Sequence, residues 1–489
     1  MMKLLLLFGI YFSISGLTFS QKLVDAQEIR EVSKFEINTF AELYAPGVTA
    51  QNSVLLVKIL YETPDISGMT DTASGLLCIP FADSESPFPV ILYHHGTADN
   101  RLDVPSEVII PIDLKAPFEI AFASQGYVVV SADYLGLGES RGFHPYVHAE
   151  TEASASIHLY EACLEYLEMD DHFLSGHLFI SGYSQGGHAA MATHRELQSN
   201  YSDIHPVTAS APKSGPYSIS KSMKDRLLSE QEYFYPGFIA FTLHSYQTVY
   251  GNLYHHFNEI FREPYASIIE NELLNEEYSI SALHDSLISS LIFEHGASIP
   301  KFMLQDSIVT GILNNPDHRI NQLLQLNDTY DWAPQVPMRL YYCEGDDQVP
   351  YVTSLLADSV MNENGALDVE AVSSGELLSH VMCAIPATVE CLAFFNSFLE
   401  PLVTYDYDDE LEFKVYPVPA NDQITIQSVK ESITGYRAQF FDRNGRLIKS
   451  ILENEDLVHI PTYDLLPGVY TLRLSSDEAT GSQKILIMR

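Results

Sequence analysis

Hydrophobic and polar positions along this chain follow two alternating patterns. Short runs rich in Val, Ile, Phe and Tyr occur at 88–97, 126–138, 206–216 and 337–350 and end in polar or turn residues. Between them lie stretches with apolar residues three and four positions apart, such as 152–167. Strands that alternate with helices predict an α/β fold with a mostly parallel sheet covered by helices on both faces.

The stretch 217–330 interrupts this alternation. It is rich in Leu, Tyr, Glu and Ser, and its apolar spacing indicates mostly helices. We interpret it as a helical cap inserted between strands of the sheet. Such a cap would lie over the carboxyl edge, where open α/β sheets bind their ligands.

The pattern changes again after an acidic run at 403–412. Residues 413–489 contain short alternating strands separated by turn residues such as Asn444-Gly445. This pattern predicts a small antiparallel β-sandwich. We therefore expect a main domain at 21–402, an acidic linker and a C-terminal sandwich.

The first twenty residues carry one lysine followed by an apolar run that ends in small residues. This composition is typical of a secretory signal peptide, 1–20, with cleavage expected between Ser20 and Gln21. The run is too short for a membrane anchor, and no second long apolar stretch follows it. We expect an exported protein with no transmembrane segment in its mature chain.

Composition narrows the range of partners and cofactors. The 65 acidic and 26 basic residues give a net charge of −39, which repels nucleic acid and anionic membrane surfaces. No HExxH, paired CxxC or dinucleotide fingerprint occurs, so we expect neither a metal nor a cofactor. The odd number of cysteines leaves at least one thiol unpaired within the chain; the five are Cys78, Cys163, Cys343, Cys383 and Cys391.

The pentapeptide GYSQG at 182–186 matches the Gly-x-Ser-x-Gly pattern. Within 177–197 it follows a predicted strand and opens a predicted helix, which is the context of a nucleophile elbow. The turn is so tight that side chains two residues before and after the serine would collide with backbone, which explains Gly182 and Gly186. We predict that Ser184 is a nucleophile rather than a helix-capping serine.

A serine hydroxyl needs a histidine base and an acid that orients it. In this arrangement the acid and then the histidine follow the serine along the chain. Asp346 ends a predicted strand and is our first choice of acid, while Asp347 stays open as the alternative. Beyond them only His380 and His459 follow, and His459 lies in the predicted sandwich. We therefore predict that His380 is the base.

The oxyanion formed by such a serine needs fixed N–H donors, each worth about 3 kcal/mol in the transition state. One donor should be the backbone of Gln185, which follows the nucleophile. The other should come from the loop after the strand that begins at residue 88. We predict Thr97 for this role, with Gly96 as the alternative.

Five motifs together resemble the α/β-hydrolase superfamily: YHHGT, DYLGLGES followed by HPY, GYSQGGHAA, YYCEGDDQVPY and SHVMCAIPA. More narrowly they are similar to secretory lipases and bacterial lysophospholipase- or esterase-like relatives, over roughly residues 40–400. The resemblance implies a serine hydrolase that acts on small-molecule or lipid esters, with Ser184, Asp346 and His380 as its triad. The segment between the glycine and the acid is shorter than usual for the family, which keeps Asp347 open.

The DYLGLGES…HPY segment also matches this family, at Asp133, Tyr134, His144 and Tyr146 among other positions. These residues could line the acyl or leaving-group pocket. Alternatively, Asp133 and Tyr134 could fix a loop through buried hydrogen bonds. We expect His188, one helical turn after the nucleophile, to be a packed or cap-contacting residue rather than a second base.

The last 75 or so residues resemble the C-terminal sorting domain of the type IX (Por) secretion system, in VYPVPANDQITI, FDRNGRLIKS, LLPGVYTLRL and SQKILIMR. The resemblance implies a Bacteroidetes-type exporter, passage through the periplasm to the cell surface or medium, and removal of the tail. From the residues alone, these strands could also form an accessory module that binds carbohydrate, but we favour the sorting role.

Three further hypotheses stay open. Cys343 and Cys383 flank the predicted acid and base, so a disulfide between them would join the two triad loops. The protein could be a non-catalytic surface binding protein. It could also be a serine peptidase of prolyl-aminopeptidase type, whose carboxylate pair would come from the acidic cap residues Glu263, Glu270, Glu272, Glu276 and Glu277.

Overall fold

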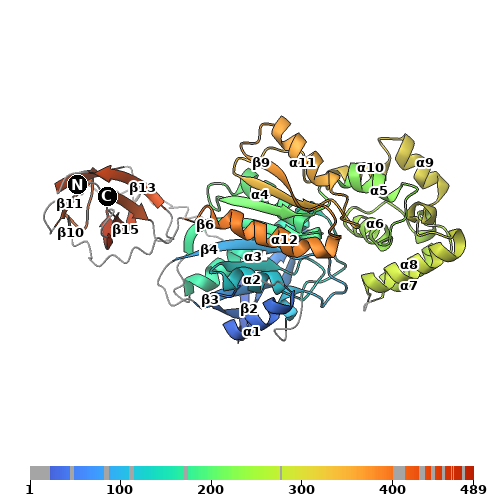
Figure 1. Ribbon diagram of the computed structural model, residues 1–489, viewed down its shortest axis with the longest axis horizontal. Helices are drawn as coiled ribbons and strands as arrows, with labels where there is room; N and C mark the ends of the chain where they lie inside the picture. Colours follow the sequence, from blue (N-terminus) through green and yellow to red (C-terminus); the bar gives the residue numbers. More distant parts are fainter. Residues whose placement is uncertain are drawn as a thin grey trace, which may run out of the picture.

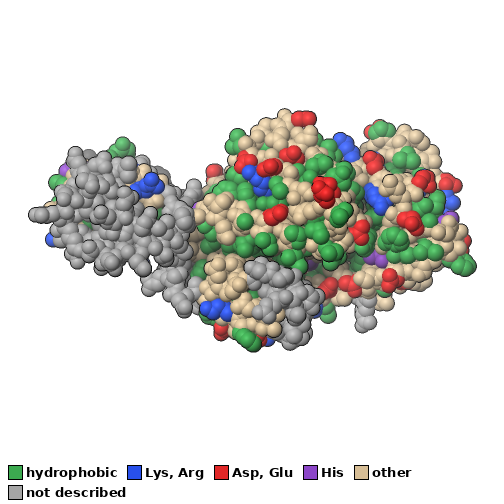
Figure 2. All heavy atoms as spheres, viewed as in Figure 1, with side chains coloured by type: hydrophobic (Ala, Val, Ile, Leu, Met, Phe, Trp, Pro, Cys, Tyr) green, Lys and Arg blue, Asp and Glu red, His purple; other side chains and the backbone are tan. Residues whose placement is uncertain are grey.

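A computed structural model gives the fold of most of the chain (Figure 1). The residues it describes are 22–44, 49–81, 87–108, 115–169, 174–275, 278–399, 413–428, 436–441, 447–453, 457–463, 465, 467–475 and 480–488. The predicted signal peptide, its cleavage site and the acidic linker lie outside these residues. Acidic side chains are scattered over the face that Figure 2 shows, as a net charge of −39 requires.

A nine-stranded sheet in the order β1-β2-β3-β5-β4-β6-β7-β8-β9 organises the larger part of the protein. Its strands are β1 (Leu23–Val32), β2 (Ser53–Pro64), β3 (Thr70–Phe81), β4 (Phe88–His94), β5 (Val128–Ala132), β6 (Leu174–Tyr183), β7 (Ala209–Lys213), β8 (Met338–Cys343) and β9 (Val369–Gly375). From β5 to β9 all neighbours are parallel, which confirms the mostly parallel sheet. The pairs β1-β2, β2-β3 and β3-β5 are antiparallel, a feature that the alternating pattern did not predict.

Helices cover both faces of this sheet, which explains why its central strands are continuously apolar. In β4, Val90 and Leu92 pack into one core while Ile91 and Tyr93 pack into the opposite one, because successive side chains of a strand alternate. The first core is covered by α3 (Ala149–Met169) and α4 (Gln185–Asn200), with α11 (Val352–Glu363) beside them, and the second by α1 (Lys34–Tyr44), α2 (Pro117–Ser124) and α12 (His380–Asn396). A short 3₁₀ helix, η1 (Pro105–Glu107), precedes α2.

Between β7 and β8 the chain leaves the sheet and forms a group of helices, on the right in Figure 1. They are η2 (Ile219–Met223), α5 (Lys224–Leu227), α6 (Gly237–Tyr250), η3 (Phe257–Glu259), α7 (Tyr265–Leu273), α8 (Ile280–His295), η4 (Pro300–Met303), α9 (Asp306–Asn314) and α10 (Arg319–Leu326). They share a separate core that includes Phe241, Leu287 and Leu323. This is the segment predicted to be the cap. Among the described residues, no helix is both long and apolar enough to cross a membrane.

The C-terminal residues form two antiparallel sheets, in the orders β10-β11-β14 and β13-β12-β15-β16. Their strands are β10 (Phe413–Tyr416), β11 (Gln423–Ser428), β12 (Tyr436–Phe441), β13 (Leu447–Glu453), β14 (Leu457–Pro461), β15 (Gly468–Ser475) and β16 (Thr480–Ile487). Ile424 of one sheet and Phe440 and Leu472 of the other belong to one core. The predicted sandwich is confirmed, whereas its turn at Asn444-Gly445 lies outside the described residues. The boundaries of the domains stay predictions.

Candidate active site

Ser184 lies at the turn between β6 and α4 with φ +60° and ψ −122°, a backbone conformation that residues other than glycine rarely adopt. The neighbouring glycines make this turn possible. A Cβ on Gly182 would lie 2.2 Å from the carbonyl oxygen of Gly186, and one on Gly186 would lie 1.9 Å from that of His94. No side chain fits at either position, so the elbow forms with the serine at its apex.

The structure brings Ser184, His380 and Asp346 together from three distant parts of the chain. Ser184 Oγ lies 2.8 Å from His380 Nε2, and His380 Nδ1 lies 2.7 Å from Asp346 Oδ2. Because a carboxylate only accepts, Nδ1 carries the proton and Nε2 is free to accept from the serine hydroxyl. Asp346 Oδ1 accepts the backbone N–H groups of Gln348 and Val349 at 3.0 and 2.8 Å. These bonds fix the orientation of the carboxylate.

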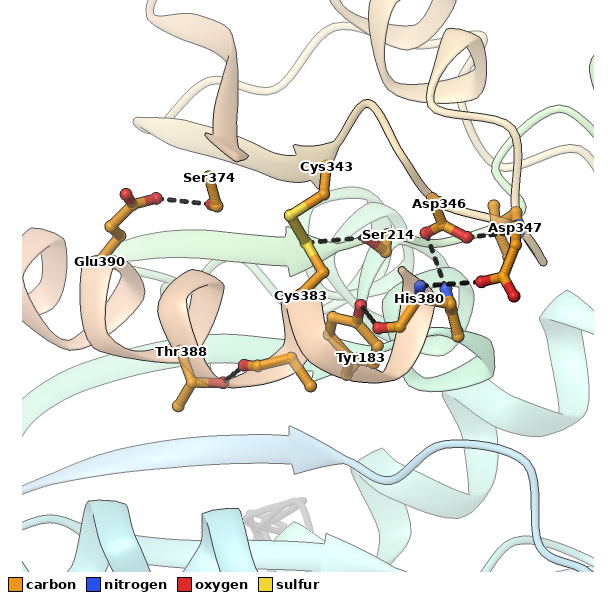
Figure 3. The surroundings of a disulfide bond; sticks show 12 residues. Tyr183, Ser214, Cys343, Asp346, Asp347, Ser374, His380, Cys383, Thr388 and Glu390 are labelled. Atoms are coloured by element: carbon orange, nitrogen blue, oxygen red, sulfur yellow. Dashed lines mark hydrogen bonds and ion pairs between the residues drawn. A yellow bond between two sulfur atoms is a disulfide. The ribbon is translucent and has the colours of Figure 1, made fainter. Parts of the chain in front are cut away.

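Asp347, the alternative acid, occupies a different position (Figure 3). Its Oδ1 accepts the backbone N–H of His380 at 3.0 Å, and its Oδ2 accepts the hydroxyl of Tyr235 at 3.2 Å. The Asp347 carboxylate therefore holds the main chain of His380 rather than its imidazole. This geometry favours Asp346 as the partner of the ring.

A disulfide joins Cys343, the last residue of β8, to Cys383 in the first turn of α12 (Figure 3). Their Cα atoms lie 5.9 Å apart, and the segment of 40 residues that it closes contains both Asp346 and His380. The sequence hypothesis of this disulfide is confirmed. On the other side, the hydroxyl of Tyr183 donates to the backbone carbonyl of His380. The start of α12, which carries the imidazole, is thus held on two sides.

The segments that carry the predicted oxyanion donors adjoin Ser184. Gln185 is the first residue of α4, where backbone N–H groups have no carbonyl partner within the helix and the helix dipole is positive. A Cβ on Gly96 would lie 3.9 Å from Ser184 Cβ, so the loop after β4 passes beside the serine. In that loop Thr97 Oγ1 lies 3.1 Å from the hydroxyl of Tyr146. The assignment of Gln185 and of Thr97 or Gly96 as donors stays a prediction.

Asp133 was a candidate pocket residue, but its carboxylate is buried below the site. Its Oδ2 accepts the hydroxyls of Ser74 and Ser106 at 2.6 and 2.5 Å, and its Oδ1 accepts the backbone N–H of Ser106 at 3.0 Å. Tyr134 donates its hydroxyl to the backbone carbonyl of His95 at 3.1 Å. These hydrogen bonds correspond to the alternative interpretation, in which both residues fix a loop.

His144 is also buried away from the cavity, and its Nδ1 donates to the carbonyl oxygen of Leu135 at 2.8 Å. Of the four candidate pocket residues, Tyr146 lines the cavity beside Ser184 and the other three do not. Those three residues do not line this cavity, and their polar atoms are hydrogen-bonded to other parts of the protein.

An apolar cavity extends from Ser184 into the cap and has an empty volume of about 820 Å³, including its open mouth. Its lining is mostly aliphatic and aromatic, and Lys224 is the single charged residue among the lining residues. The lining includes Tyr146, Met223, Leu227, Phe238, Leu243, Ile312, Leu324 and Val349.

The described acidic residues of the cap do not line this cavity. Glu263 and Glu270 are exposed, and Glu272 accepts the hydroxyl of Ser286. Glu276 and Glu277 lie outside the described residues. The geometry of the described residues thus offers no carboxylate pair for a substrate amine, and among them no group of His, Cys, Asp and Glu side chains is arranged to hold a metal.

Sequence reasoning missed Glu152, a buried carboxylate on α3 that lies beneath the elbow. Its Oε1 accepts from Gln185 Nε2 at 2.9 Å, and its Oε2 lies 2.6 Å from His188 Nδ1. The sequence carried no clear signal for it, because α3 contains four other glutamates. His188 is packed, as expected, and also contacts the cap through the carbonyl oxygen of Asn327 at 2.8 Å.

Comparison with known proteins decides the family. The family model of secretory lipases matches residues 111–394, which is 284 of the 489 residues. The chain belongs to the secretory lipase family. A second family model, that of the secretion system C-terminal sorting domain, matches residues 414–488. No curated protein matches the sequence of this secretory lipase.

Solved structures of hydrolases are similar to the main part of this chain. A candidate hydrolase from Legionella pneumophila subsp. pneumophila str. Philadelphia 1 is 29% identical with a TM-score of 0.70, over 78% of this chain and 100% of that chain. The rice cell wall degrading esterase LipA from Xanthomonas oryzae is 28% identical with a TM-score of 0.66, over 77% and 98%. Candida antarctica lipase A in its closed state shares the fold, with 16% identity and a TM-score of 0.55 over 78% and 83%.

These findings identify a hydrolase of the lipase or esterase type. The sorting domain and the family together identify a secreted or cell-surface protein that is handled by a type IX secretion system.

Proposed function

We propose that this secretory lipase is a serine hydrolase that cleaves carboxylic esters, with Ser184 as nucleophile, His380 as base and Asp346 as its orienting acid. One observation carries the proposal: two consecutive hydrogen bonds of 2.8 and 2.7 Å run from the serine hydroxyl through the imidazole to the carboxylate. The serine also lines an apolar cavity, so a bound acyl group would be adjacent to it.

In the proposed reaction, His380 Nε2 takes the proton from Ser184 Oγ as the oxygen attacks the ester carbonyl carbon. Asp346 stabilises the imidazolium that forms. The backbone N–H groups of Gln185 and Thr97 bind the oxyanion, at about 3 kcal/mol for each donor. The imidazolium then protonates the leaving alcohol. Water, activated by the same imidazole, attacks the acyl-enzyme and releases the acid.

The cavity supports an acyl group of largely hydrocarbon character. Its cap side is formed by Leu, Ile, Met and Phe side chains, which bind alkyl chains by burial of apolar surface at about 25 cal/mol per Å². The opposite side is formed by Ser184 and its neighbours. We infer that the acyl chain lies in the cavity and that the alcohol leaves through the open mouth.

The test is Ser184→Ala, assayed on p-nitrophenyl esters of short and long acids. The proposal expects kcat/KM to fall by at least about 10³-fold and labelling by a fluorophosphonate probe to disappear. Ser199→Ala, which changes an exposed serine on the same helix, is the matched control and should behave like wild type. Full activity of Ser184→Ala would sink the proposal, and an unreactive wild-type serine would favour a binding protein.

A further inference from the structure

The side chain of Gln185 is buried under the elbow although its residue borders the substrate cavity. Its Nε2 lies 2.9 Å from Glu152 Oε1 and 2.8 Å from His144 Nε2. Both amide hydrogens therefore have an acceptor. The two acceptors come from α3 and from the loop after β5, so the amide is held by two separate parts of the fold.

The direction of these hydrogen bonds is determined by the surrounding groups. His144 Nδ1 faces the carbonyl oxygen of Leu135 at 2.8 Å and must donate to it, which leaves Nε2 as an acceptor. Burial lowers the pKa of His144 to about 4, so the ring is neutral at neutral pH. Turning the Gln185 amide over would place its oxygen against the Glu152 carboxylate. The amide consequently has one orientation, even though its Oε1 has no partner among the described residues.

The second oxygen of the Glu152 carboxylate is held by His188. Glu152 Oε2 lies 2.6 Å from His188 Nδ1, and His188 Nε2 donates to the carbonyl oxygen of Asn327 at 2.8 Å. The Asn327 side chain accepts the backbone N–H of Ala149 at 3.0 Å. Glu152 and His188 are both buried, and buried polar groups are rigid when their hydrogen bonds are all made.

Gln185 directly follows Ser184, so the hydrogen bonds of its side chain bear on the backbone of the elbow. Ser184 has a strained backbone with φ +60°, and such strain persists only where the surroundings hold it. The simplest relaxation rotates the peptide between Ser184 and Gln185, and that peptide carries the N–H assigned to the oxyanion. A fixed Gln185 side chain opposes this rotation.

We propose that Glu152 and His144 are positioning residues that hold the Gln185 amide and thereby keep the Gln185 backbone N–H directed at the oxyanion. Neither residue lines the cavity, so both act through Gln185. The inference rests on the proposed function, because it assigns a role in that same reaction. It predicts that loosening Gln185 weakens binding of the transition state more than binding of the ester.

The experiment compares Gln185→Met, Glu152→Leu and the double variant. The readouts are kcat and KM on a p-nitrophenyl ester and Ki for a trifluoromethyl ketone, whose adduct with a serine carries the oxyanion. We expect Gln185→Met to lower kcat about 10- to 100-fold with KM within about twofold, and to raise Ki by the factor by which kcat/KM falls. The double variant should lose no more kcat than Gln185→Met, because Gln185→Met already removes the hydrogen bond between Gln185 and Glu152.

Glu150→Leu is the matched control, because Glu150 is exposed on the same helix, and it should leave all constants unchanged. If Glu152→Leu does not fold, Gln185→Met decides alone. A folded Gln185→Met with wild-type kcat, or a loss of kcat with an unchanged Ki, would overturn the inference. If Ser184→Ala is inactive in that case, only the positioning role fails; if Ser184→Ala is active, the proposed function fails as well.

Discussion

Removal of the Cys343–Cys383 disulfide should destabilise the main part of the protein strongly and impair the proposed active site. The bond closes a segment of 40 residues. For a loop of this length, the loss of chain entropy in the unfolded state corresponds to about 4 kcal/mol at 25 °C. Both cysteines are fully buried, so cavities left by the double variant Cys343→Ala/Cys383→Ala add to this figure.

The assay is urea unfolding followed by tryptophan fluorescence. The single tryptophan of the chain, Trp332, packs against a core cluster that includes Met338 and Leu340 of β8, the strand that ends in Cys343. Its emission therefore follows unfolding of the sheet beside the disulfide. Cys163→Ala removes a fully buried free thiol and is the matched control for the loss of a sulfur atom. We expect this control to lose about 1 kcal/mol.

The double variant should also lose kcat under conditions where it stays folded, because the bond joins the loops that carry Asp346 and His380. A free energy of unfolding within about 1 kcal/mol of the control, at an unchanged slope with urea, would refute the loop-closure reasoning. Wild-type kcat in the folded variant would show that the loops hold their positions without the bond.

Two further predictions concern single carboxylates. Asp346→Asn should lower kcat by about 10⁴-fold, because an amide favours the wrong tautomer of His380. Asp347→Asn should lower kcat tenfold or less, because the Asp347 carboxylate contacts the backbone N–H of His380 rather than the ring. Equal losses of kcat in the two variants would contradict the assignment. Burial raises the pKa of Glu119 from 4.5 to about 7, so this group lowers stability progressively as the pH rises from 4.5 through 7. Glu119→Gln can still accept a hydrogen bond from Ser131. In urea unfolding, its free energy of unfolding should therefore exceed that of wild type by up to about 3 kcal/mol at pH 8 and equal it near pH 4. A difference that does not change with pH would contradict this.

Much of the fold could be predicted from the local spacing of apolar and polar residues. The continuous apolar run of β4 and the helix spacing of α3 each depend on neighbours in the sequence, and both elements formed close to their predicted ranges. The elbow was equally local, since the strain at Ser184 is relieved by glycines two residues away. The antiparallel strands β1 to β3 were missed, because the alternation of strand and helix begins only after them.

The sequence by itself determined which chemistry the chain can carry. It places a serine on a glycine-framed turn, then an acid, and after that acid a single histidine outside the sandwich. Only the tertiary structure decided which acid faces the imidazole, because Asp346 and Asp347 are adjacent and differ only in the direction of their side chains. The same holds for the cavity and for Glu152. Their roles depend on contacts between residues far apart in the chain, and periodicity carries no information about such contacts.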